Sequence, residues 1–300
     1  MKKKIALVGF GYWGKVYYKY LKKKYKIIVY TRSKVKNITN FHNCEFTNKI
    51  SKILKDKNIK KVFVITPINT HFQISKKFLN SNKKVLCEKP LILKETETNL
   101  IERKFKNQIF VSYPYTYSKV LKEVKNIISK HKLGIPRFIY INFSQAGRFN
   151  KNSVYQLLGP HVLSIVSKFY KLENYLINKK KTNMFSYKNE TGIYEISKNK
   201  KVFSEIIIST NYLFDKKKEI IFFFENSNII CDLAKNKENI ILRKYSREKI
   251  KTYEYANIKY EKKFSVGDKD NIKLVINKFL KDKISFKNNM KLTKLINVNI

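Results

Sequence analysis

The sequence predicts an α/β protein in two parts: a doubly wound parallel sheet, followed by an α+β domain with a large open, mostly antiparallel sheet. Three observations support this. Short apolar runs alternate with helix-compatible stretches over the first third of the chain, a glycine-rich turn follows the first apolar run, and strand-like runs dominate after residue 183. Strands separated by helices are typical of parallel sheets, whereas strands that follow one another directly form antiparallel sheets.

The first domain is expected to span residues 1–116. Its strand-like runs cover residues 3–10, 26–32, 60–67, 83–90 and 108–114. The helix-compatible stretches between them cover residues 17–24, 50–57, 71–80 and 94–105. Pro67, Pro90 and Pro114 end three of the strands, because proline cannot donate to a strand ladder. The carboxyl ends of parallel strands meet at one edge of the sheet, so these prolines mark that edge.

The second domain is expected to span residues 117–300. After a helical segment near 117–131, residues 134–145 alternate between apolar and polar side chains, as a half-buried strand does. Strand-rich runs continue from residue 183, and their spacing predicts an antiparallel sheet. A helix over residues 271–283 follows and can pack back on the first domain.

The formal net charge of +43 at pH 7 suggests nucleic-acid binding as one class of function. The lysines, however, run through nearly every segment, and arginine, which is best suited to bidentate phosphate and base contacts, is scarce. We interpret the charge as compositional background. No specific nucleic-acid partner is expected, and nucleic-acid binding is kept only as a remote alternative.

Membrane, secreted and metal-binding classes find no support in the sequence. No apolar stretch approaches the roughly 20 residues of a membrane span, and the basic start lacks the apolar core and cleavage site of a signal peptide. The three cysteines are scattered and form neither a disulfide framework nor a metal-ligand pattern. We expect a cytoplasmic protein with no membrane partner and no metal site.

Three of the eight glycines, Gly9, Gly11 and Gly14, form the sequence GFGYWG directly after the first strand. A GxGxxG pattern between a strand and a helix is typical of a Rossmann-type NAD(P) site. The first glycine permits a tight turn, the second lets the backbone approach a pyrophosphate, and the third permits close helix packing. The helix N-terminus supplies N–H groups for the phosphates, and Tyr12 and Trp13 lie in the same loop.

The end of the second strand bears on the choice between NAD and NADP. A free ribose calls for an acidic residue about twenty residues after the glycines. The sequence there includes Thr31, Arg32 and Ser33 and has no carboxylate. Arg32 and Ser33 could hold a 2′-phosphate, which favours NADP. The alternative is that Arg32 is only a solvated loop cation.

Four motifs, in this order, resemble those of the glucose–fructose oxidoreductase / inositol dehydrogenase / MocA (Gfo/Idh/MocA) oxidoreductases. They are GFGYWG (9–14), TPINTH (66–71), CEKPL (87–91) and GPHVLSI (159–165). The second half of the chain matches only in its strand-rich pattern. The resemblance implies an NAD(P)-dependent oxidoreductase that transfers a hydride between nicotinamide and a hydroxyl or keto group of a sugar, polyol or nucleotide sugar. It also implies a homo-oligomer.

The resemblance assigns Lys89 of the EKP motif as the candidate general acid/base, in contact with both cofactor and substrate. Glu88 and Pro90 are expected to fix its loop. A lysine at the carboxyl edge of the sheet lies where α/β folds bind ligands, and partial burial there would lower its pKa. Further cofactor contacts are implied for Thr66, Pro67, Asn69 and His71, with the alternative that His71 only starts a helix capped by Asn69 or Thr70.

His161 is the second candidate catalytic residue, because the family places a histidine at the start of a helix facing the nicotinamide and the substrate. An imidazole titrates near neutral pH and so suits proton transfer. Family members usually carry an aspartate four residues earlier, but this chain has Leu157, and Gln156 is one position off register. The missing carboxylate supports an alternative, a catalytically impaired dinucleotide-binding protein of the same fold.

Two more residues are candidates for substrate contact. Tyr115 lies in the sequence SYPYTYS after the last strand of the first domain, and aromatic packing is its alternative role. Arg148 follows the first strand of the second domain and could hold a carboxylate or phosphate of the substrate.

Overall fold

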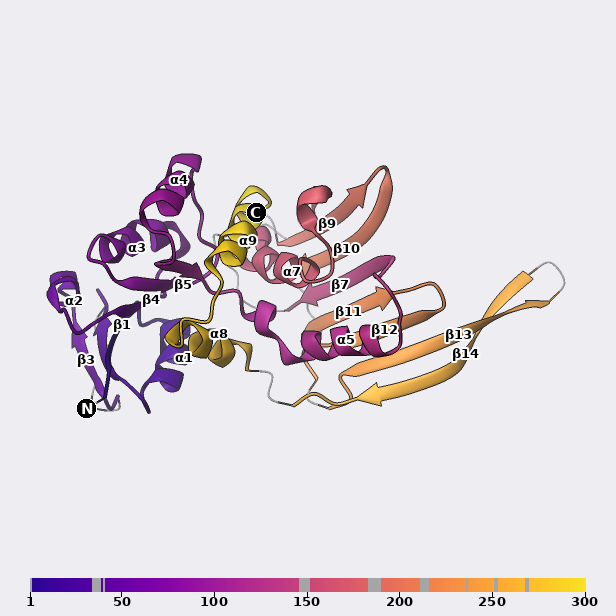
Figure 1. Ribbon diagram of the computed structural model, residues 1–300, viewed down its shortest axis with the longest axis horizontal. Coiled ribbons are helices and arrows are strands. Elements are labelled where there is room, and N and C mark those ends of the chain that lie inside the picture. The colour runs from indigo at the N-terminus through magenta and orange to yellow at the C-terminus, as the bar shows by residue number, and fades with distance from the viewer. Residues whose placement is uncertain are drawn as a thin grey trace. The chain divides into compact units, whose positions relative to one another are not determined.

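The computed structural model of the chain divides into two compact units, each built around its own sheet (Figure 1). The first unit comprises residues 1–112 and 272–298, and the second comprises residues 113–271 and 299–300. The α/β class is confirmed, with one parallel sheet and one mostly antiparallel sheet. The structure describes residues 2–33, 39, 41–145, 152–182, 190–210, 216–235, 237–250, 253–267 and 270–300.

The first unit contains a six-stranded parallel sheet in the order β3-β2-β1-β4-β5-β6. The strands are β1 (Lys4–Val8), β2 (Lys26–Tyr30), β3 (Cys44–Thr47), β4 (Lys61–Val64), β5 (Lys84–Cys87) and β6 (Ile109–Val111). The central strands are almost wholly apolar and buried, as expected for strands covered on both faces. The strand order reverses between β1 and β4, and open α/β sheets bind ligands in the crevice at such a switch point.

In the described part of the first unit, α-helices and a short 3₁₀ turn connect these strands. They are α1 (Tyr12–Leu21), α2 (Ile50–Lys55), η2 (Ile68–Thr70), α3 (His71–Leu79) and α4 (Glu95–Lys104). Helix α1 begins five residues earlier than the predicted residue 17, because its N-cap is Gly11, which has no capping side chain to mark the start in the sequence. Strand β3 was not predicted, since it is four residues long and only half-buried.

The C-terminal helices α8 (Asn271–Leu280) and α9 (Phe286–Val298) belong to the first unit for almost their whole length. Phe279 of α8 packs edge-to-face on Phe63 and Phe110, with ring centroids 5.3 and 6.0 Å apart. Lys61 donates to the carbonyls of Phe279 and Leu280 and so satisfies the end of α8. Helix α9 was not predicted, because polar residues interrupt its apolar stripe.

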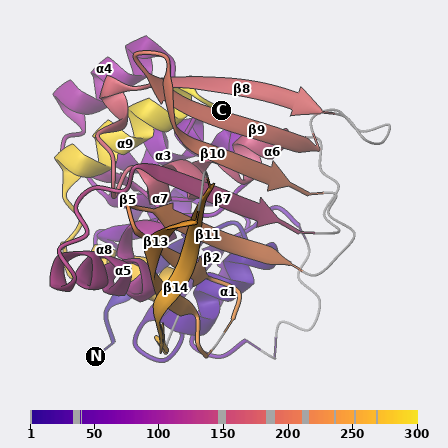
Figure 2. The same ribbon diagram turned by 90° about the vertical axis from the view of Figure 1, so that its right-hand side faces the viewer.

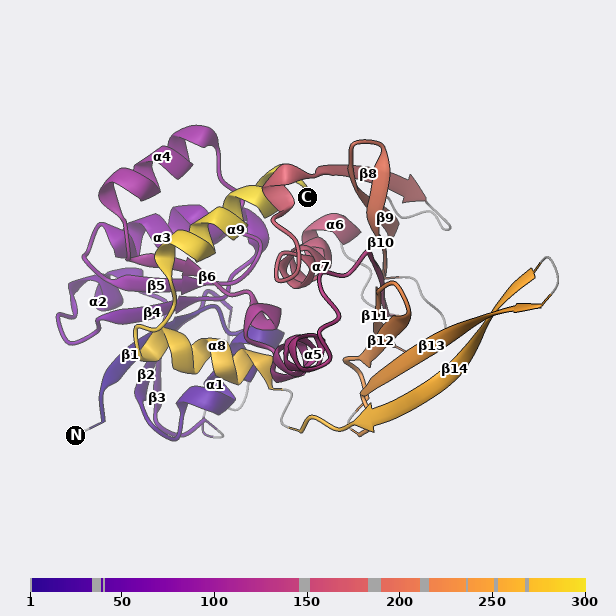
Figure 3. The ribbon, with the colours of Figure 1, turned by 45° about the vertical axis from the view of Figure 1, so that its right-hand side comes forward.

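Helix α9 covers the open edge of the sheet, next to β6 (Figure 3). The Val111 N–H donates to Asn289 Oδ1 at 2.8 Å, and Asn289 Nδ2 donates to the Val111 carbonyl at 2.9 Å. The asparagine side chain thus takes the place of a further strand at this edge. Asn297 makes the same pair of bonds with the backbone of Leu93.

The second unit contains an eight-stranded sheet in the order β14-β13-β12-β11-β7-β10-β9-β8 (Figure 2). Its strands are β7 (Phe138–Ser144), β8 (Leu176–Thr182), β9 (Thr191–Lys198), β10 (Lys201–Ser209), β11 (Lys217–Phe223), β12 (Ser227–Asp232), β13 (Ile240–Ile250) and β14 (Tyr253–Phe264). All neighbouring strands are antiparallel except β7 and β10, which are parallel. Strand β8 starts before the predicted residue 183, because its lysine-rich sequence masks the strand pattern.

Helical segments of the second unit pack beside its sheet. They are η3 (Pro114–Tyr117), α5 (Lys119–Lys130), α6 (Val154–Leu157), α7 (Gly159–Val166) and η4 (Leu172–Asn174). Ile139, Ile141 and Phe143 alternate along β7 as buried residues, which fits a sheet with one face against these helices. None of the helices formed by the described residues is long and apolar enough to cross a membrane.

We expect Asn289→Ala to lower the free energy of unfolding of the first unit by about 2–4 kcal/mol, because both backbone groups of Val111 lose a buried partner. Urea unfolding followed by the emission of Trp13, the single tryptophan, measures this effect. The control is Asn288→Ala at the neighbouring exposed position, with an expected change within about 0.5 kcal/mol. Equal losses in the two variants would contradict the role of Asn289.

Candidate functional site

The turn after β1 requires glycine at its first position. Gly9 has φ of +97°, and its N–H donates to the Tyr30 carbonyl of β2 at 2.9 Å. A Cβ atom at Gly9 would lie 2.2 Å from the Ile65 carbonyl oxygen, immediately after β4. The turn therefore fits between two neighbouring strands only because it has no side chain.

The other two glycines of the loop differ in what surrounds them. A Cβ atom at Gly14 would lie 2.3 Å from the Gly9 carbonyl oxygen, so Gly14 permits the close packing of α1 on the turn. At Gly11, no atom of the described residues lies within 4 Å of the same position. Gly11 is also the N-cap of α1 and provides no capping side chain. The chain thus presents open backbone at a helix N-terminus, which fits a pyrophosphate.

The aromatic residues of the loop face outward. Tyr12 and Trp13 are 60% and 44% exposed, and their rings meet edge-to-face at 5.3 Å. They begin α1, next to the open backbone of Gly11. Trp13 is therefore a suitable reporter for binding at this loop.

The end of β2 forms a small turn beside the glycine loop. The Ser33 N–H donates to Thr31 Oγ1 at 3.3 Å, and the Thr31 N–H donates to the Thr47 carbonyl. Arg32 and Ser33 are exposed, and no acidic residue lies between Tyr30 and Ser33. A cationic and hydroxyl-bearing turn of this kind suits a phosphate better than a ribose diol.

The loop after β4 begins at Thr66, whose methyl group lies 3.2 Å from the Cβ position of Gly9. Pro67 and Asn69 are exposed. The Thr70 hydroxyl lies 2.8 Å from Thr66 Oγ1 and 2.7 Å from the Pro67 carbonyl oxygen. Thr70 is the N-cap of α3 but makes no side-chain capping bond, so the expected capping role is wrong for its hydroxyl.

His71 is a buried link between two loops, with only 2% of its surface exposed. Its Nδ1 lies 2.7 Å from the Pro90 carbonyl oxygen, and its Nε2 lies 2.7 Å from the Thr66 carbonyl oxygen. Carbonyl oxygens only accept, so both ring nitrogens carry protons when both bonds form. Burial opposes this charge, but the Cys87 thiol and the two carbonyls outweigh it and raise the pKa of His71 to about 9.

Glu88 of the EKP motif is held by a buried tyrosine, Tyr17, which belongs to none of the four motifs. The Tyr17 hydroxyl of α1 donates to Glu88 Oε1 at 2.6 Å and lies 2.9 Å from Ser112 Oγ. The Lys89 N–H donates to Glu88 Oε2 at 3.1 Å. Burial, followed by the charge of Glu88, raises the pKa of Tyr17, which keeps this phenol a donor.

Lys89 follows the carboxyl end of β5 and is joined to Pro90 by a cis peptide bond. Its side chain is half-buried. Desolvation lowers the pKa of Lys89 to about 8, against the opposing effect of the Glu88 carboxylate. A lysine with this pKa exchanges a proton near neutral pH, which an ordinary surface lysine does not.

In the second unit, two of the predicted substrate residues lie together. The His161 ring, at the start of α7, meets the Tyr115 ring edge-to-face at 5.3 Å and lies 6.3 Å from the Phe143 ring. Lys218 of β11 joins them: its ammonium donates to the Tyr115 hydroxyl and lies 4.7 Å from the centre of the Phe143 ring. Lys218 was not predicted, because it is one of many lysines in the sequence.

Two further positions singled out from the sequence are Leu157 and Arg148. Leu157 ends α6 and is half-buried, and its N–H donates to the Ser153 carbonyl. Arg148 lies outside the described residues. The described part of the chain contains no group of three histidine, cysteine or acidic side chains able to hold a metal ion.

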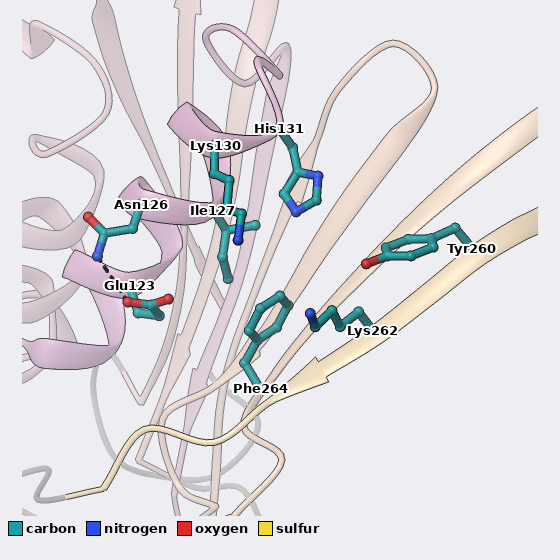
Figure 4. A pocket seen from close by; sticks show the side chains of 8 residues that line it. All are labelled: Glu123, Asn126, Ile127, Lys130, His131, Tyr260, Lys262 and Phe264. Atoms are coloured by element: carbon teal, nitrogen blue, oxygen red, sulfur yellow. Dashed lines mark hydrogen bonds between the residues drawn. The ribbon is translucent and has the colours of Figure 1, made fainter.

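A cavity of about 320 Å³ lies in the second unit between α5 and β14 (Figure 4). His131 and Tyr260 face each other across it, with ring centroids 6.4 Å apart. Burial and the charges of Lys244, Lys130 and Lys262 lower the pKa of His131. None of the predicted site residues lines this cavity.

The raised pKa of His71 predicts a pH-dependent contribution to stability. The contribution should be complete below pH 6.5, the ordinary value, and should be lost as the pH rises through about 9. It amounts to at most about 3 kcal/mol. We expect His71→Gln to abolish this part of the pH dependence in urea unfolding, whereas His42→Gln, at an exposed position, should retain it. A wild-type ring with a single protonated nitrogen at pH 7.5, seen by ¹⁵N NMR, would contradict the assignment.

Comparisons with known proteins agree with the fold. Residues 3–113 match the sequence model of an oxidoreductase family with an NAD-binding Rossmann fold. The chain is 28% identical over 92 residues to inositol 2-dehydrogenase of Salmonella paratyphi B, a match that covers 29% of this chain and 27% of that relative. The matched stretch is thus about a quarter of the relative's own length.

Solved structures share the fold of nearly the whole chain. The UDP-N-acetylglucosamine 3-dehydrogenase of Acidithiobacillus ferrooxidans superposes with a TM-score of 0.78 at 10% identity, covering 99% of this chain and 96% of that one. The myo-inositol 2-dehydrogenase of Lactobacillus plantarum gives 0.73 at 14% identity, covering 99% and 95%. At these identities the likeness concerns the fold. The family model matches residues 3–113 of the 300, and beyond them the comparisons show a likeness of fold alone.

Proposed function

We propose that the protein is a cytoplasmic NAD(P)-dependent oxidoreductase that transfers a hydride between nicotinamide C4 and a carbon of a sugar, polyol or nucleotide sugar. One observation carries this proposal. The carboxyl edge of a single parallel sheet holds both the open backbone at Gly11 and a lysine, Lys89, whose pKa is about 8. The first feature suits a dinucleotide, and the second suits proton transfer to or from a hydroxyl group.

The chain's own residues would divide the work as follows. Backbone N–H groups at the start of α1 bind the pyrophosphate, with Gly9 and Gly14 shaping the turn. Tyr12, Trp13, Thr66, Pro67, Asn69 and Glu88 complete the cofactor surface, and His71 fixes the two loops that carry part of it. A bound nicotinamide supplies the hydride donor or acceptor.

Lys89 acts as the general acid or base. Its Nζ accepts the proton of the substrate hydroxyl during oxidation and returns it during reduction, since its pKa lies near the working pH. His161 is the second candidate for this proton transfer. Tyr115 and Arg148 are proposed to contact the substrate.

We favour NADP as the cofactor because the turn after β2 offers Arg32, Thr31 and Ser33 and no carboxylate between residues 30 and 33. Residues 1–116 are proposed as the cofactor domain and 117–300 as the substrate domain, except that helices α8 and α9 pack on the first unit. The substrate domain is also proposed to carry the contacts of a homo-oligomer. The names of the relatives suggest myo-inositol and UDP-N-acetylglucosamine as the first substrates to try.

A second function is favoured by Leu157. The resemblance to the family leads us to expect an aspartate four residues before His161, and this chain has Leu157 there. The protein would then bind the dinucleotide without turnover. Measurable oxidation of any compound of a sugar, polyol and nucleotide-sugar panel rules this alternative out.

Titration with NADPH and NADH tests the cofactor site through Trp13 emission. We expect quenching at micromolar NADPH and weaker quenching by NADH, with the preference reduced in Arg32→Ala. Gly11→Ala should weaken the binding of the nucleotide by more than about 10-fold, because the added methyl group would occupy the space proposed for the pyrophosphate. The methyl group meets no protein atom within 4 Å, so the fold should tolerate it. Gly267→Ala, equally open but in the second unit, is the matched control. Absence of any response to either nucleotide, checked by calorimetry, would end the proposal.

Substitution of the proposed acid/base gives a separate prediction. Lys89→Met should lower kcat by about 10²–10⁴-fold while leaving the dissociation constant of the cofactor nearly unchanged. Lys77→Met, at an exposed position of α3, is the control and should retain full activity. The wild-type pH profile should show a group near pH 8 that is lost in Lys89→Met. An unchanged kcat in Lys89→Met would exclude Lys89 from proton transfer.

A further inference from the structure

The hydrogen bond between Lys218 and Tyr115 in the second unit has a fixed direction. An ammonium group has three protons and no lone pair, so Lys218 donates and the phenol oxygen of Tyr115 accepts. The proton of the Tyr115 hydroxyl must therefore point away from Lys218. A tyrosine paired with a carboxylate, such as Tyr17 with Glu88, has the opposite arrangement, because there the phenol hydroxyl donates its hydrogen bond to the partner.

Among the described residues, no group accepts the Tyr115 proton. Tyr115 is only 8% exposed, so water has little access to it. A buried donor without an acceptor destabilises a folded protein, which makes such a donor uncommon unless a ligand uses it. Burial raises the pKa of Tyr115, so the phenol keeps its proton over the physiological range and acts as a donor, not as a base.

The surroundings hold the pair in one orientation. The Lys218 ammonium lies over two rings, 4.7 Å from the centre of Phe143 and 5.3 Å from that of Tyr115. The His161 ring also belongs to this group, through its edge-to-face contact with Tyr115 and its distance of 6.3 Å from the Phe143 ring. Four elements, η3, β7, α7 and β11, thus contribute one side chain each to the group around the phenol.

We propose that the Tyr115 hydroxyl donates a hydrogen bond to an oxygen of the substrate beside His161, and that Lys218 is the positioning residue that directs this proton. The inference rests on the proposed oxidoreductase function and adds a specificity element to it. A substrate with a hydroxyl or carbonyl oxygen at this point is bound, and an analogue that lacks this oxygen is rejected, because it leaves the buried phenol proton without a partner. Tyr115 touches the substrate, whereas Lys218 acts through Tyr115.

The test uses the full chain labelled with [¹³Cζ]tyrosine, in which the Tyr115 signal is the one missing from Tyr115→Phe. With NADH or NADPH bound, myo-inositol and UDP-N-acetylglucosamine are each added to about 10 mM, well above ordinary KM values. We expect one of them to shift the Tyr115 signal. Tyr115→Phe should weaken the binding of that compound by about 10-fold, the value of one directed hydrogen bond.

Variants of Lys218 separate positioning from structural support. Lys218→Met should raise KM several-fold, Lys218→Arg should restore most of the loss because it keeps a donor, and Lys218→Met should add nothing in the Tyr115→Phe background. Lys217→Met, at the neighbouring exposed position of β11, is the matched control. Additive effects of the two substitutions, or a stability loss in Lys218→Met with unchanged KM, would show a merely structural contact and overturn the proposal.

Failure of this inference can be told apart from failure of the proposed function. If Trp13 responds to the nucleotides but neither compound moves the Tyr115 signal, the substrate role of the Tyr115–Lys218 pair is wrong and the cofactor site stands. If the emission of Trp13 does not change with either nucleotide, the oxidoreductase proposal is wrong, and this inference, which rests on it, is wrong as well.

Discussion

The close approach of the β1–α1 turn to β4 is the constraint on which the rest of the first unit depends. Gly9 lies between the Tyr30 carbonyl of β2 and the Ile65 carbonyl after β4, in space that any side chain would fill. This approach sets where α1 begins and how steeply it leaves the sheet. The position of α1 in turn brings Tyr17 to Glu88 and leaves the backbone at Gly11 open. The open backbone at Gly11 and the anchor of the EKP loop thus both depend on one missing side chain.

Buried side-chain hydrogen bonds stabilise the loops at the carboxyl edge of the sheet, where the backbone makes no strand–strand hydrogen bonds. Tyr17 links α1 to the loop after β5, and His71 links the loop after β4 to the same loop through Pro90. Such contacts are costly to bury unless every donor finds an acceptor, and both of these side chains do. The loops are therefore fixed relative to one another before a ligand arrives, which lowers the entropic cost of binding.

The local patterns of the sequence were sufficient for the fold class and for the glycine and EKP motifs, because their residues are neighbours in the chain. Features made by distant residues were not accessible in the same way. Tyr17 and Glu88 are 71 residues apart, Tyr115 and Lys218 are 103 apart, and Val111 and Asn289 are 178 apart. No periodicity or spacing connects such pairs, and in a lysine-rich chain Lys218 has no distinguishing context. The role of His71 as a link between loops was missed for another reason: both of its partners are backbone carbonyls, which no residue type marks in the sequence.

The covering of β6 by α9 has a consequence for the synthesis of the protein. The first sheet is complete once residue 111 has left the ribosome, but its open edge gains its cover only when residues 286–298 emerge. The 174 residues between Val111 and Phe286 take roughly 10–35 s to translate, and during this interval an unpaired strand edge is exposed. The nascent chain therefore passes through a state prone to strand pairing with its neighbours, and the cell's chaperones would meet it there.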